Sequence, residues 1–312
     1  MSSVEAVSFP NAEGLKLFGT LHQPATPVVS LPAVVLLSPG VKMRVGPGRL
    51  YVPLTEMLTS LGCTVLRFDF YGLGDSEGEL QDKMLPEVYG NIEVGRYVDD
   101  TLSALGWLEA EHGFGRFVLG GLCGGAITAL LAAQNDDRVE GLLSLGMTVT
   151  LASNEATPGR YMTRTALDQR RRDYLRKLLR PQAWLRFLTF KSEYDVIWHS
   201  VKGRRTRPAP TLSDGVPGPV EQRGDANPLF PPAFLAFLAR GGRALMLFSE
   251  KDRLTSQYEE KFVEPFAERL QPFLSQIDKH VVADANHVMS FHQWQREMVG
   301  VCRDWLVKLY AA

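Results

Sequence analysis

Hydrophobic and polar residues follow one another along the chain in blocks that predict strands and helices in alternation. Short apolar runs typical of buried parallel strands occur at 32–38, 63–70, 116–122, 139–145, 244–249 and 277–283. Segments with helical periodicity lie between or after them, at 52–61, 85–112, 126–133, 256–270 and 290–309. Residues 4–9 and 15–23 predict an antiparallel hairpin ahead of this pattern. The alternation predicts an α/β fold whose mostly parallel sheet is covered on both faces.

The alternation stops between residues 151 and 235, where no strand is evident. We interpret 151–235 as a mainly helical cap, inserted into an α/β core formed by 1–150 and 236–312. Residues 203–232 hold seven of the 19 prolines and four glycines, which predicts an extended lid loop. Aromatic residues on one helical face of the cap either line an acyl pocket or pack the cap onto the core: Trp184, Phe187, Phe190, Tyr194 and Trp198.

The most informative stretch is Gly121-Leu122-Cys123-Gly124-Gly125, where an apolar run meets small, helix-forming residues. A nucleophile on a tight strand-to-helix turn needs neighbours without Cβ atoms, because strand and helix pack closely beneath it. Gly121 and Gly125 meet that need. The turn also places Cys123 at a helix N-terminus, so we expect a lowered pKa for its thiol and a reactive thiolate. The alternative is a buried cysteine in a glycine-rich turn of another α/β protein.

A cysteine nucleophile needs a base to remove its proton and a carboxylate to orient that base. Asp252 and His287 each come just after a predicted buried strand. Both are therefore expected at the carboxyl ends of parallel strands, where ligands bind in open α/β sheets. Glu250 is the alternative to Asp252, whereas His292 stands in a Phe-His-Gln-Trp context that favours helix packing. The predicted catalytic residues are Cys123, His287 and Asp252.

The negative oxygen formed by nucleophilic attack needs two preorganised N–H donors, which form an oxyanion hole. One donor is predicted at Gly124, directly after the nucleophile. The other is predicted at Val41, in the loop after the strand at 32–38. Lys42 and Arg44 lie in the same loop, and they either bind an anionic substrate or are simply solvated.

The run Asp69-Phe-Tyr-Gly-Leu-Gly-Asp-Ser-Glu-Gly78 resembles the D-x-x-G-x-G-x-S loop of the α/β-hydrolase superfamily, especially its serine-aminopeptidase-like branch. The resemblance covers the chain outside the cap, and the order nucleophile, acid, histidine agrees with it. Most members carry serine at the turn, whereas this chain carries Cys123. In this respect the turn resembles that of dienelactone hydrolases and polyhydroxyalkanoate synthases, which also carry cysteine there. A looser likeness links Ser-Pro-Gly-Val-Lys-Met-Arg and the Asp69 run to hydrolases that accompany polyketide, peptide and exopolysaccharide gene clusters. The resemblance implies an α/β-hydrolase fold for the chain outside the cap.

Charge is unevenly distributed along the chain. Residues 160–207 contain 14 Arg and Lys and four acidic residues, a net charge of +10, while the whole chain carries −1. A basic cap over the active site would attract an anionic donor such as coenzyme A or an acidic acyl carrier protein. The alternative is a solvated helix whose arginines pair with carboxylates of the core. The balanced total gives no reason to expect nucleic acid as a partner.

Three scattered cysteines indicate neither a disulfide framework nor a zinc site, and the predicted chemistry uses no metal and no cofactor. The first residues lack the basic start and apolar run of a signal peptide, and no stretch approaches the roughly 18 apolar residues of a membrane span. We therefore expect a cytoplasmic protein without a membrane span. The sequence reveals no single exposed apolar surface, so the oligomeric state stays open.

Attack by a Cys123 thiolate would give an S-acyl enzyme, whose thioester can pass its acyl group onward. A thioester is the expected donor, because attack on a thioester exchanges one thiolate for another. The leading hypothesis is a thioesterase or an acyltransferase of specialised metabolism, the latter with an amine or alcohol as acceptor. The alternatives are a carboxylester or lactone hydrolase of the dienelactone type, and a catalytically silent hydrolase fold that binds a ligand.

Overall fold

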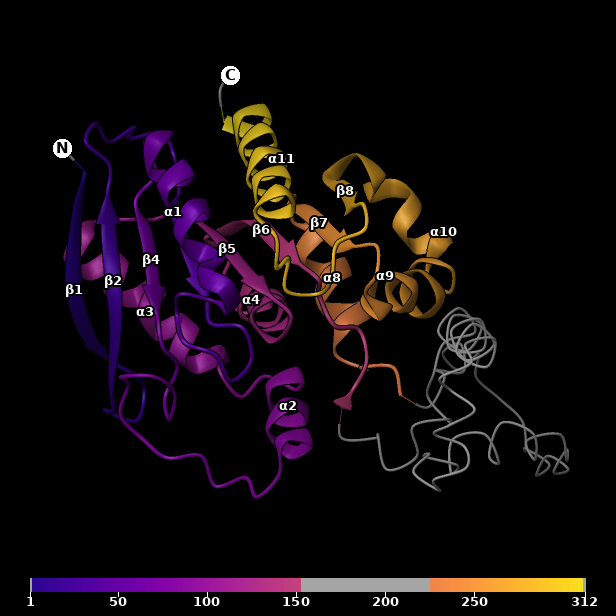
Figure 1. Ribbon diagram of the computed structural model, residues 1–312, viewed down its shortest axis with the longest axis horizontal. Helices are drawn as coiled ribbons and strands as arrows, with labels where there is room; N and C mark the ends of the chain where they lie inside the picture. Colours follow the sequence, from indigo (N-terminus) through magenta and orange to yellow (C-terminus); the bar gives the residue numbers. More distant parts are fainter. Residues whose placement is uncertain (1, 153–224, 311–312) are drawn as a thin grey trace, which may run out of the picture. The chain divides into compact units, whose positions relative to one another are not determined.

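The computed structural model describes residues 2–152 and 225–310, and these contain an eight-stranded sheet (Figure 1). The strand order is β1-β2-β4-β3-β5-β6-β7-β8. β1 pairs antiparallel with β2, and β2 with β4, whereas every other pair is parallel. The predicted mostly parallel sheet with an N-terminal hairpin is thus confirmed. In chain order the strands are Ser3–Pro10, Lys16–Gln23, Ala33–Leu37, Val65–Phe68, Phe117–Leu122, Val139–Leu145, Arg243–Ser249 and Ile277–Val282.

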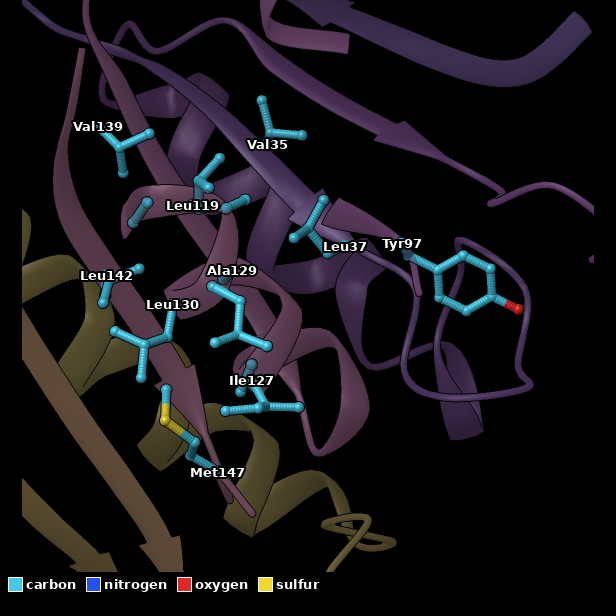
Figure 2. Close-up of a cluster of buried hydrophobic side chains, with 14 of the residues drawn as sticks. Val35, Leu37, Tyr97, Leu119, Ile127, Ala129, Leu130, Val139, Leu142 and Met147 are labelled. Carbon is cyan, nitrogen blue, oxygen red and sulfur yellow. The ribbon is translucent and has the colours of Figure 1, made fainter. Parts of the chain in front are cut away.

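Helices cover both faces of the sheet, so its central strands are buried on two sides. On one face, α3 (Val98–His112), α4 (Gly124–Gln134) and α8 (Phe230–Ala239) pack over residues such as Val35 and Leu119 (Figure 2). On the other face, α1 (Tyr51–Ser60) and α11 (His292–Tyr310) pack over Val34 and Leu36. Because successive side chains of a strand point to opposite faces, one apolar run in β3 serves both cores. Each fully buried side chain contributes roughly 1.5–3 kcal/mol.

Two helices that the periodicity predicted as continuous are interrupted. The stretch 85–112 forms α2 (Leu85–Glu93) and α3, separated at Gly95, whose φ of 106° cannot occur in a right-handed helix. The stretch 256–270 lies in α9 (Arg253–Tyr258), a π-helical turn (Glu259–Val263) and α10 (Ala267–Leu270). The apolar spacing therefore predicted helical structure in both segments but predicted its continuity wrongly.

The end of the predicted lid loop is helical. α8 starts at Phe230 with two prolines in its first turn, where proline is tolerated because those N–H groups lack acceptors within the helix. Phe230 and Phe234 are buried in the core, so this helix belongs to the α/β core and not to the cap. No helix of the described residues is long and apolar enough to cross a membrane. Most of the predicted cap lies outside the described residues, including Trp184, Phe187, Phe190, Tyr194 and Trp198.

Candidate active site

Cys123 occupies the turn between β5 and α4, where the backbone is strained. Its φ of 55° lies in the left-handed region that residues other than glycine rarely adopt. A Cβ on Gly121 would lie 2.5 Å from the carbonyl carbon of Gly125, and a Cβ on Gly125 would lie 2.5 Å from the carbonyl oxygen of Leu37. Only glycine fits at both positions, so β3, β5 and α4 meet closely beneath Cys123. The cysteine itself is half-buried.

The buried phenol of Tyr51, in α1, fastens this turn to the neighbouring strand. Its hydroxyl donates to the carbonyl oxygen of Leu37 at 2.9 Å and accepts from the amide of Leu122 at 2.7 Å. Burial raises the pKa of Tyr51, and the charge of Cys123 acts in the same direction, so the phenol stays protonated and keeps donating. Tyr51 could not be recognised from the sequence, because no local pattern marks a contact with a residue 71 positions later.

Asp252 and His287 are hydrogen-bonded to each other. Asp252 follows β7 and caps α9, where its Oδ1 accepts from the amide of Leu254 at 3.3 Å. Its Oδ2 lies 2.5 Å from Nδ1 of His287, in the turn after β8. Glu250, the alternative acid, instead accepts from the amide of Asp284 at 2.7 Å. The structure therefore pairs the histidine with Asp252.

The imidazole of His287 lies over Gly146, where a Cβ would be 3.6 Å from the ring atoms Cε1 and Nδ1. Burial alone lowers the pKa of His287, but hydrogen bonds to Asp252 and Cys123, with the charges of both groups, raise it to about 10. The ring is therefore protonated at neutral pH. Cys123, His287 and Asp252 lie together, in an arrangement suited to nucleophilic and acid–base chemistry.

The first turn of α4 meets the loop that contains Val41 beside Cys123. A Cβ on Gly124 would lie 3.0 Å from Cα and 3.1 Å from N of Gly40. Within residues 2–152 and 225–310, the amides of Gly124 and Val41 donate to no backbone acceptor. Two such amides beside a nucleophile match the requirement of an oxyanion hole.

Residues 34–301 match the family model described as "Alpha/beta hydrolase family". The chain belongs to this family. The hydrolase is similar in structure to the esterase Pf2001 of Pyrococcus furiosus, with a TM-score of 0.59, 16% identity, and coverage of 99% of this chain and 93% of the esterase. It is also similar to a proline iminopeptidase of Mycobacterium smegmatis, with a TM-score of 0.56, 16% identity, and coverage of 97% and 98%. At such identities these likenesses show the fold alone.

A relative in sequence is YtaP of Bacillus subtilis (strain 168), a protein named as a candidate hydrolase. It is 31% identical to this chain over 90 residues, which are 28% of this chain and 30% of YtaP. The match thus spans less than a third of that relative. Family membership confirms the predicted α/β-hydrolase fold and agrees with the expectation of an enzyme.

In this hydrolase, α2 approaches the site with two residues that no sequence motif marks. The ring of Tyr89 lies 2.8 Å from the position of a Cβ on Gly40, and Ile92 lies 3.0 Å from that of a Cβ on Gly124. Burial raises the pKa of Tyr89, and the charge of Cys123 raises it further. The phenol is therefore within electrostatic reach of the sulfur and lies against the oxyanion loop.

Glu93, at the end of α2, contacts both ends of the gap in the described chain. Its buried carboxylate accepts from the amide of Ala152 at 2.5 Å, and its carbonyl oxygen accepts from the side-chain amide of Asn227 at 2.6 Å. An isolated antiparallel β-bridge between Thr150 and Ala226 joins the same two segments of the chain. Residues 150–152 and 226–227 thus lie together beside the end of α2.

Arg44 of the hydrolase is engaged by carboxylates, whereas Lys42 is exposed. The Arg44 guanidinium contacts the buried carboxylate of Asp69, and its Nη2 lies 2.7 Å from Oδ2 of Asp75. Both acids belong to the loop Asp69–Gly78 that resembles the family's motif. An anionic substrate would have to compete with them, so in this structure Arg44 fixes that loop to the oxyanion loop.

Proposed function

We propose that this hydrolase carries acyl groups on Cys123 and acts on acyl thioesters, as a thioesterase or an acyltransferase. The observation that supports this most strongly is a cysteine on a strained turn, beside a His287 imidazole that is hydrogen-bonded to Asp252. A protonated imidazole beside the sulfur favours a thiolate, which attacks without first losing a proton.

In the first step, the Cys123 sulfur attacks the thioester carbonyl and forms a new C–S bond. The amides of Gly124 and Val41 are the donors that we assign to the negative oxygen. The bond to the leaving sulfur then breaks, and the His287 imidazolium gives its proton to the departing thiolate. In the second step, neutral His287 takes a proton from water, an amine or an alcohol, which attacks the acyl group and releases the Cys123 thiolate.

Two features support a thioester as the donor. A thiolate nucleophile is readily expelled again from a tetrahedral intermediate, so attack on an amide mostly reverses, whereas attack on a thioester exchanges similar leaving groups. The net charge of +10 over residues 160–207 is complementary to coenzyme A and to acidic acyl carrier proteins.

The proposal is tested by intact mass after incubation with octanoyl-CoA, octanoyl acyl carrier protein or p-nitrophenyl octanoate. We expect an octanoyl adduct on the wild type, no adduct on Cys123→Ala, and hydrolysis of both thioesters faster than that of the ester. Cys123→Ser is the matched control, because it keeps a nucleophile at the turn but removes the sulfur. An adduct that persists in Cys123→Ala would refute the proposal.

A carboxylester hydrolase of the dienelactone type is the second candidate, since an esterase is among the similar structures. Faster turnover of the p-nitrophenyl ester than of both thioesters would favour it. Adding an amine or alcohol to the thioester assay separates acyl transfer from hydrolysis, because transfer gives an amide or ester in place of the free acid.

A further inference from the structure

A groove of about 540 Å³ lies between α1 and α11, and none of the proposed catalytic residues lines it. Its floor is apolar and half-buried, formed by Val52, Pro53, Met57 and Val299. A volume of this size lies within the range of small-molecule sites in proteins.

The rim of the groove is basic. Arg49 and Arg296 are exposed, and neither pairs with a carboxylate within the described parts of the chain. A third arginine of the lining, Arg303, pairs with Asp304, its own neighbour in sequence, at 2.9 Å. The groove therefore combines an apolar floor with cationic groups that lack counter-ions in the described structure.

The two helices run in the same direction, because each follows a parallel strand of the sheet (Figure 1). Their first turns lie side by side, since Gly48 is close to Gln295: a Cβ on Gly48 would be 3.7 Å from Nε2 of Gln295. Arg49 and Arg296 therefore lie at one end of the groove. At 1.5 Å per residue, the lining from His292 to Arg303 extends for roughly 16 Å along α11.

We propose that this groove binds a straight-chain alkyl carboxylate, with its head group at Arg49 and Arg296 and its chain along Val52, Met57 and Val299. A guanidinium pairs with a carboxylate through two parallel hydrogen bonds, which accounts for the head group. The alkyl chain covers the apolar floor and removes it from water. The site is independent of the thioester chemistry proposed above.

Gly300 allows a direct test, because a Cβ there would meet no atom within 4 Å. Gly300→Leu is therefore expected to place an isobutyl group in the groove. Gly106→Leu is the matched control: Gly106 lies in α3 and also has no atom within 4 Å of its Cβ position. Decanoate is titrated into each full-length protein by calorimetry, with decanol as the uncharged comparison.

We expect Gly300→Leu to weaken decanoate binding at least tenfold and Gly106→Leu to leave it unchanged. Arg296→Gln, at an exposed position where folding is not at risk, should weaken it about fivefold, the worth of an exposed ion pair. Decanol should bind more weakly than decanoate. Equal decanoate titrations for wild type, Gly300→Leu and Arg296→Gln would overturn the proposal, as would the absence of binding to the wild type. Decanol that binds as tightly as decanoate would overturn the assignment of the arginines.

Discussion

Removing one hydroxyl, in Tyr51→Phe, should both destabilise the hydrolase and slow the chemistry at Cys123. The hydroxyl joins the carbonyl oxygen of Leu37 to the amide of Leu122, at 2.9 and 2.7 Å, in the fully buried interior. Without it, a buried N–H and a buried carbonyl each lose this partner, and an unsatisfied buried group costs about 1–3 kcal/mol. A carbonyl that loses one partner costs less than an N–H that loses its partner, so we expect the free energy of unfolding to fall by about 2–4 kcal/mol in total.

For a chain of this size, that loss should lower the melting temperature by about 3–6 °C. Unfolding in urea, followed by tryptophan fluorescence, measures the free energy directly. Tyr258→Phe is the matched control, because Tyr258 is also buried and its hydroxyl makes no hydrogen bond among the described residues. We expect the control to change the free energy of unfolding by less than about 1 kcal/mol.

The same substitution should alter the site, because Leu122 directly precedes Cys123. The rate of alkylation by iodoacetamide in the native protein reports on Cys123, since burial raises the pKa of Cys63 to about 11 and that of Cys302 to about 12. We expect a rate at least threefold lower in Tyr51→Phe, in line with a loss of about 1 kcal/mol at the turn. If unfolding free energy and alkylation rate both matched the wild type, Tyr51 would have no part in holding the turn.

Three further predictions concern the charged groups. Asp252→Asn should lower the turnover of a thioester by roughly 10²-fold in a steady-state assay, because His287 loses the carboxylate that orients it; a change below threefold would contradict the pairing. Arg44→Gln should reduce the free energy of unfolding by about 2–4 kcal/mol, because it leaves buried Asp69 unpaired, while Lys42→Gln at an exposed position should change it by less than about 0.5 kcal/mol. His287 has a folded-state pKa raised from 6.5 to about 10, so its stabilising contribution should be complete below about pH 6.5 and disappear as the pH rises towards 10. Urea unfolding at several pH values should therefore show a steeper decline for wild type than for His287→Gln, and parallel curves would count against the assigned contacts.

Much of the fold follows from local signals in the sequence. Apolar runs such as Ala33–Leu37 predict buried strands because both faces of the sheet must exclude water, and this condition repeats in every parallel strand. Gly121 and Gly125 predict the turn that holds Cys123, because close packing there depends on the absence of Cβ atoms in adjacent residues. Asp252 and His287 each follow a predicted strand, and the expectation that they lie close together rests on one rule: the carboxyl ends of parallel strands lie at the same edge of a sheet.

Other features depend on which distant residues meet, and the sequence alone did not reveal them. Tyr51 supports the turn from another helix. Tyr89 reaches the oxyanion loop from a helix that ends at Glu93, an end that the apolar spacing did not show. From the sequence, Arg44 could be either solvated or a substrate contact. Only the folded chain brings the carboxylates of Asp69 and Asp75 to its guanidinium. The sequence thus determined the order of elements and the residues at strand ends, because these follow from periodicity and backbone sterics. Tertiary packing decided which side chains support the site, because it sets the direction and distance of groups far apart in the chain.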